Sequence, residues 1–98
     1  MPIRHVVMFT WAEGVDDEHV ATVSAALDGL PAAVPSIKQY VHGPDLGLSE
    51  GNFDYAVVAD FDDEAGYVAY RDDATHQQLI ADHIKPFITA RAAVQHAV

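Results

Sequence analysis

Several kinds of residue and segment are missing from this sequence or scarce in it. It contains no cysteine, which excludes disulfide bonds and thiolate zinc sites. It has no run of 18 apolar residues, and its first residues, MPIRHVVMFTW, contain no apolar segment of signal-peptide length. We therefore expect a cytoplasmic protein that does not span a membrane.

Basic residues are also scarce. The 98 residues include 5 Lys and Arg against 15 Asp and Glu, giving a formal net charge of −10. This charge would repel the phosphates of nucleic acids and of anionic lipids, so neither nucleic acid nor membrane is an expected partner. With 50% hydrophobic residues, the chain is long enough for one compact domain over residues 1–98. A domain this small buries only about two-thirds of its unfolded surface, which favours a second subunit.

No pattern of metal or nucleotide ligands stands out. The sequence has six histidines, but His76 and His83 lie seven residues apart, whereas zinc-binding pairs on one helix lie three or four apart. The glycines of the loop over residues 43–52 do not match a phosphate-binding motif. We therefore predict no metal and no cofactor.

Hydrophobic patterns predict two similar halves. Asp16 or Asp17 can cap a helix whose apolar residues recur at helical spacing: Val20, Val23, Leu27 and Leu30. A second helix is predicted after the acidic residues 62–64, which suit the positive end of the helix dipole. Alternating or β-branched stretches predict four strands, at Ile3–Trp11, Ile37–His42, Phe53–Phe61 and Ile88–Val98.

The stretch AYRDDATHQQL, residues 69–79, predicts a break in the second helix. The negative charges of two aspartates late in a helix are unfavourable near the negative end of the helix dipole. Asp73 is instead a good N-cap for a new helix from Ala74 to about Ile84, ended by Pro86. Tyr70 and His76 flank this break. On one straight helix they would lie on different faces, but a bend can direct both into one cavity.

The order βαββαβ predicts an α+β, ferredoxin-like antiparallel sheet with the helices on one face. The other face carries apolar residues such as Val6, Met8 and Val58. An uncovered apolar sheet face is usually buried by a second subunit, so a homodimer is predicted.

Four segments together resemble one family: IRHVVMF, LPAAVPSIKQYVHG, FDYAVVADFDDEAGYVAY and THQQLIADHIKPF. In order and spacing they are similar to the stress-responsive A/B barrel (Dabb) domain of the dimeric α+β barrel superfamily. The main landmarks are His5, the VPSI turn, and Tyr70 followed six residues later by His76. This resemblance implies a dimer whose two sheets form a barrel, with a small cavity between sheet and helices in each subunit.

The resemblance also implies an activity. Polyketide cyclases of the olivetolic acid cyclase type belong to this family and use a histidine and a tyrosine at the positions of His76 and Tyr70. A neutral imidazole can remove a proton from a carbon between two carbonyls, and a tyrosine hydroxyl can hydrogen-bond the resulting enolate oxygen. His76 and Tyr70 are therefore the candidate catalytic residues, and His5, which matches a pocket histidine of these cyclases, is a candidate ligand contact.

Other candidate ligand contacts follow from position and from departures from the cyclases. Tyr55 stands where the cyclases carry a histidine, Leu27 where they carry a tyrosine, and Asp73 where the family often has His-Pro. Trp11 shares the helix-facing parity of its strand and could wall the cavity. The predicted ligand is a small apolar or aromatic molecule bearing a carbonyl. Two alternatives remain: a stress-related homo-oligomer without chemistry, and a cofactor-independent monooxygenase of the same superfamily.

Overall fold

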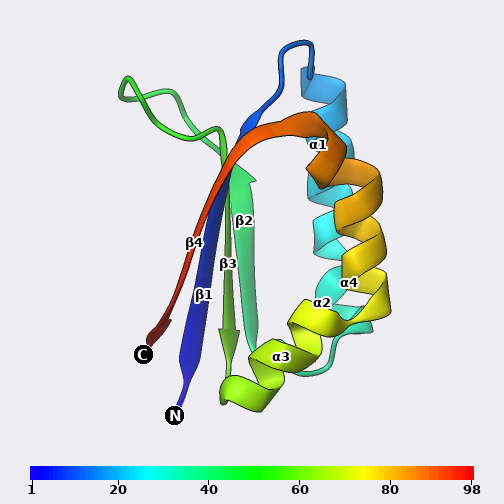
Figure 1. Ribbon diagram of the computed structural model, residues 1–98, viewed down its shortest axis with the longest axis vertical. Helices are drawn as coiled ribbons and strands as arrows, with labels where there is room; N and C mark the ends of the chain where they lie inside the picture. Colours follow the sequence, from blue (N-terminus) through cyan, green and yellow to red (C-terminus); the bar gives the residue numbers. More distant parts are fainter.

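The computed structural model describes residues 1–98 and contains one four-stranded antiparallel sheet. Its strands follow the spatial order β2-β3-β1-β4 (Figure 1). Their bounds are Ile3–Trp11 for β1, Gln39–Pro44 for β2, Tyr55–Phe61 for β3 and Ile88–Ala97 for β4. The predicted α+β, ferredoxin-like βαββαβ order is confirmed.

The helices all lie on one side of this sheet (Figure 1). The first half contributes α1, Asp17–Asp28, and the short α2, Leu30–Ala33. The second half contributes α3, Glu64–Asp72, and α4, Ala74–Leu79, which continues into the π-helical turn η1, Ile80–Ile84, and the 3-10 turn η2, Lys85–Phe87. No helix is both long and apolar enough to span a bilayer.

Aspartate caps start the three main helical segments. The carboxylate of Asp16 accepts a hydrogen bond from the His19 backbone N–H at 2.9 Å, and Asp63 caps α3 in the same way. Asp73 both ends α3 and caps α4, accepting from the His76 N–H at 3.0 Å. Each carboxylate satisfies one of the free N–H groups of the first turn. The predicted break between Asp72 and Asp73 is therefore confirmed.

Several element ends differ from the prediction. β2 runs on to Pro44 instead of ending at His42, and β4 ends at Ala97 instead of Val98. The strands expected to begin at Ile37 and Phe53 begin two residues later, at Gln39 and Tyr55. The Ile37 N–H instead closes a turn onto the Val34 carbonyl, and the Asp54 N–H bonds the Phe9 carbonyl. The helix expected to run to Ile84 ends as an α-helix at Leu79 and widens into η1, since Pro86 lacks the N–H that would continue a regular helix.

The hydrophobic core fills the space between sheet and helices. Inward-facing strand residues such as Phe9, Val57 and Phe61 pack against helix residues such as Leu27 and Leu30, each at most 2% exposed. The opposite sheet face has no such cover. There Met8 is 37% exposed and Val41 and Val94 are more than half exposed, leaving an apolar surface crossed by one ion pair, Arg4 with Asp60.

Candidate functional site

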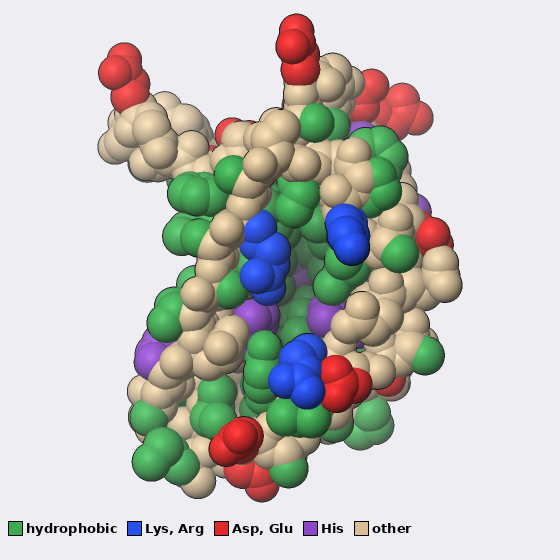
Figure 2. Space-filling model, viewed as in Figure 1, with side chains coloured by type: hydrophobic (Ala, Val, Ile, Leu, Met, Phe, Trp, Pro, Cys, Tyr) green, Lys and Arg blue, Asp and Glu red, His purple; other side chains and the backbone are tan.

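A cavity of about 450 Å³ lies between the sheet and the second-half helices. Figure 2 shows its opening as a hollow between the β4 edge and the helical segment that faces it. Sixteen residues line it, and ten of them are hydrophobic. The floor comes from β1, β2, β3 and β4, and the roof from α1 and the segment from α3 to η2. Such a mainly apolar cavity with a few polar groups is typical of a small-molecule site.

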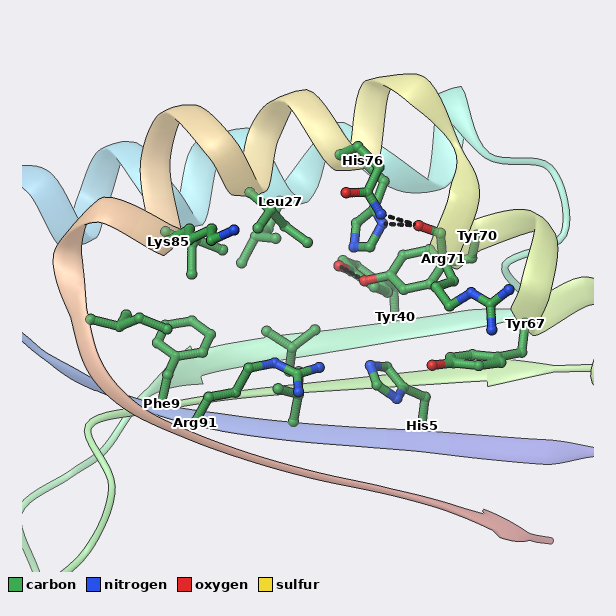
Figure 3. Close-up of a pocket in the computed structure, with 16 residues that line it drawn as sticks. His5, Phe9, Leu27, Tyr40, Tyr67, Tyr70, Arg71, His76, Lys85 and Arg91 are labelled. Atoms are coloured by element: carbon green, nitrogen blue, oxygen red, sulfur yellow. Dashed lines mark hydrogen bonds between the residues drawn. The ribbon is translucent and has the colours of Figure 1, made fainter.

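The break between α3 and α4 brings Tyr70 and His76 together. Their ring centroids lie 4.0 Å apart, with the ring planes inclined by 32°. Both side chains are buried and both line the cavity. Because Asp73 restarts the helix in a new direction, residues six apart share one side of the bent segment (Figure 3).

The same break orients the imidazole of His76. A helix that stops at Asp72 leaves the Arg71 carbonyl without its usual backbone donor, so the ring Nδ1–H of His76 donates to it at 3.4 Å. The Gln77 side-chain amide donates to the same carbonyl. With the proton on Nδ1, the other nitrogen, Nε2, is a free acceptor directed into the cavity (Figure 3). Burial lowers the pKa of His76, which keeps the ring neutral at pH 7.

His5 presents the complementary group on the floor of the cavity. The side-chain amide of Gln95 on β4 donates to Nδ1 of His5 at 2.8 Å. Because an amide nitrogen only donates, Nδ1 is the acceptor, and Nε2 carries the proton. Burial, together with the charge of Arg91 and the nearby His76, lowers the pKa of His5 to about 4. His5 is therefore a neutral hydrogen-bond donor, whereas His76 is a neutral acceptor.

Two tyrosines that the sequence analysis did not select complete the polar wall. The hydroxyl of Tyr40 lies 3.0 Å from that of Tyr70, and the ring of Tyr67 packs beside that of His5, with centroids 5.1 Å apart and planes inclined by 46°. Burial raises the pKa of both Tyr40 and Tyr70, so both remain protonated phenols. Only one O–H is used between them, which leaves the other proton for a ligand.

Two predicted ligand contacts lie elsewhere in the fold. Leu27 and His5 line the cavity, but Tyr55 and Trp11 do not. The Tyr55 hydroxyl is held by Ser24 and His42, each at 2.8 Å, because Tyr55 stands opposite Phe9 at the far end of the sheet from His5. Trp11 packs edge-on against Phe9 and serves the core. Strand parity gave the correct face for both residues but not their position along it.

The six histidines do not form a metal site. No group of three or more His, Cys, Asp or Glu side chains converges closely enough to hold an ion.

Sequence and structure comparisons identify the family of this chain. Residues 3–97 match the family described as the stress responsive A/B barrel domain. The chain belongs to this stress responsive A/B barrel family. A comparison with curated protein sequences gives no match.

Solved structures of similar fold cover nearly all of the A/B barrel chain. A dimeric ferredoxin-like protein of unknown function from Thermobifida fusca shares 47% identity with a TM-score of 0.93, covering 100% of this chain and 92% of that one. A Dabb family protein from Mesorhizobium loti shares 16% identity, TM-score 0.83, over 99% and 96% of the two chains. The hydroxynitrile lyase from Passiflora edulis shares 17%, TM-score 0.86, over 99% and 93%. At these lower identities the likeness is one of fold.

Proposed function

We propose that the chain, as a single domain over residues 1–98, forms a homodimer in which each subunit binds an apolar, carbonyl-bearing small molecule and removes a proton next to its carbonyl. The observation that carries this proposal is the pair of neutral imidazoles facing one apolar cavity. His76 offers a free Nε2 acceptor, and His5 offers an Nε2–H donor. A base and a donor of this kind are what enolate formation requires.

The reaction is polyketide cyclase-like. His76 Nε2 takes the proton from the carbon next to a carbonyl, and Nδ1–H stays bonded to the Arg71 carbonyl, so the imidazolium is held in place. The electron pair of the broken C–H bond moves onto the carbonyl oxygen, which accepts hydrogen bonds from the Tyr70 hydroxyl and from His5. The enolate carbon then bonds to a second carbonyl carbon of the same substrate molecule. His76 returns its proton to the new alkoxide oxygen.

The fold offers a precedent for an enzyme. One structural neighbour of this chain is a hydroxynitrile lyase. At 17% identity this neighbour supports only the suitability of the fold for catalysis.

The proposal of a homodimer is based on the apolar sheet face. Its exposed residues include Met8, Val41 and Val94, and the Thermobifida fusca relative with 47% identity is described as dimeric. Pairing two such faces would bury them and close the two sheets into a barrel. We expect an interface of at least the standard size, roughly 1,600 Å² in total.

Proton removal can be tested without knowing the natural substrate. The protein is incubated in D₂O with 4-phenyl-2-butanone, an apolar ketone, and deuterium uptake next to the carbonyl is followed by NMR. General base catalysis typically contributes about 10²–10⁴-fold, so His76→Ala should lose most of the catalysed exchange, and Tyr70→Phe part of it. His83→Ala, on η1 and outside the residues that line the cavity, is the matched control. Exchange no faster than in buffer, or unchanged in His76→Ala, refutes the proposal.

A further inference from the structure

The charge around the cavity opposes the charge of the protein. The chain has five basic residues, and three of them line the cavity: Arg71, Lys85 and Arg91. None of the 15 acidic residues is among the sixteen lining residues. In a chain of net charge −10, a cavity lined by cations and by no carboxylate is an electrostatic feature that would attract an anion.

Two of these cations have no partner. Arg4 pairs with Asp60, Lys38 with Asp62, and Arg71 with its neighbour Asp72. Lys85 and Arg91 form neither a salt bridge nor a side-chain hydrogen bond, although acidic residues outnumber basic ones threefold. Both side chains are exposed. The fold therefore does not use their charges, which remain available to a ligand.

Their positions define the two sides of the opening. Arg91 lies on the β4 edge opposite Phe9, and Lys85 lies in η2 at the end of the helical roof. Figure 2 shows basic side chains around the hollow, with histidines deeper inside. Figure 3 shows Lys85 above and Arg91 below the cavity, with His76 and His5 further in. The walls near them are apolar, formed by residues such as Phe9, Ile84 and Ile88.

We propose that the natural ligand is an apolar acid whose carboxylate is held between Arg91 and Lys85 at the cavity mouth. This inference rests on the proposed function and names its substrate class. A planar guanidinium donates two parallel hydrogen bonds to a carboxylate, and the ammonium of Lys85 donates a further charge-assisted hydrogen bond. The carboxylate then stays at the mouth, while the apolar body enters and brings its carbonyl to His5 and His76.

A carboxylate fits this mouth better than a phosphate group. Phosphate sites usually add backbone N–H groups from a helix N-terminus or a glycine-rich loop. Here Arg91 comes from a strand and Lys85 from the C-terminal end of the helical segment. The N-terminus of α4, beside His76, is already capped by the Asp73 carboxylate.

Matched acid and amide probes test this inference. Dissociation constants are measured by calorimetry for 1-naphthylacetate and 1-naphthylacetamide, and likewise for the phenyl and biphenyl pairs. The two members of each pair have nearly the same shape, but only the acid is charged. The acid of the best-fitting pair should bind at least about tenfold more tightly than its amide. Lys85→Met and Arg91→Met should each weaken acid binding by about tenfold and leave amide binding within about twofold. Lys38→Met, which removes an equal charge outside the cavity, should change neither.

The outcomes separate this inference from the proposed function. If the amides bind as tightly as the acids, or if Lys38→Met weakens acid binding as much as Arg91→Met, the carboxylate assignment is wrong while the cavity remains a binding site. If no acid and no amide binds, the proposed cavity function fails as well. Inorganic phosphate is titrated alone, and binding tighter than that of the best acid would overturn the carboxylate in favour of a phosphate group.

Discussion

Replacing His5 by glutamine should remove a large part of the acid sensitivity of this fold. His5 is only 4% exposed, and its pKa is lowered from 6.5 to about 4 by burial first, then by the charge of Arg91 and by His76. The folded protein therefore keeps this imidazole neutral at pH values where the unfolded chain protonates it. Lowering the pH therefore shifts the folding equilibrium toward the unfolded state, because only the unfolded chain readily protonates His5.

The size and the sign of the effect follow from these two values. Above pH 6.5 neither state binds the proton, so His5 has no effect on the pH dependence. Between pH 6.5 and 4 the unfolded state binds more protons, so the free energy of unfolding falls as the pH falls. The loss from His5 reaches about 2 kcal/mol at pH 5 and levels off near 3 kcal/mol below pH 4. His76, whose pKa is also lowered by burial, adds a loss of the same sign.

Urea unfolding at fixed protein concentration, at pH 7, 6 and 5, measures this loss for the wild type and for His5→Gln. The carboxylates titrate in both proteins, so their contribution cancels when the two pH profiles are subtracted. The variant should lose about 2 kcal/mol less than the wild type between pH 7 and 5. His83→Gln, on η1 and away from both the cavity and the apolar sheet face, should follow the wild type. An equal loss in His5→Gln and wild type would refute the argument that His5 is buried in its neutral form.

Four further substitutions test other parts of the structure. His76→Ala should lower the free energy of unfolding by less than about 1 kcal/mol, because Gln77 still donates to the Arg71 carbonyl. Leu30→Ala in the core should lower it by about 2–5 kcal/mol. Equal losses for the two variants in urea unfolding would show that His76 is structural. Val58→Asp, in the middle of the apolar sheet face, should yield monomers in sedimentation velocity, and an intact dimer would place the interface elsewhere. Asp73→Ala removes the cap of α4 and should cost about 1 kcal/mol; it should also slow ketone deuteration by loosening His76, and an unchanged rate would mean that the cap does not orient the imidazole.

The fold was predictable because its strongest signals are local. The alternation in β1 and β3 assigns one face to the core, and the aspartates at positions 16, 63 and 73 mark the helix starts. The predicted starts of β2 and β3 were less accurate. Ile37 and Phe53 continue the strand pattern, yet the backbone around them bonds to other segments, which depends on the tertiary arrangement.

The site was predictable only where its residues are close in the sequence. The spacing of Tyr70 and His76 around an aspartate break indicates how both can point to one side. Tyr40 reaches Tyr70 only because β2 lies below α3, and Arg91 reaches the cavity only because β4 pairs with β1. No local pattern carries that information. Strand parity also cannot tell how far along the sheet a side chain lies, which is why Tyr55 was misplaced.

The protonation of the two cavity histidines tests the proposed chemistry most directly. A long-range ¹H–¹⁵N correlation spectrum of the ¹⁵N-labelled protein at pH 7 distinguishes the nitrogens of each ring. We predict a proton on Nδ1 and a bare Nε2 for His76, and the reverse for His5. Adding 4-phenyl-2-butanone should shift both Nε2 signals and leave those of His96 unchanged. Reversed tautomers, or Nε2 signals that do not respond to the ketone, would contradict a cavity in which His76 is the base and His5 the donor.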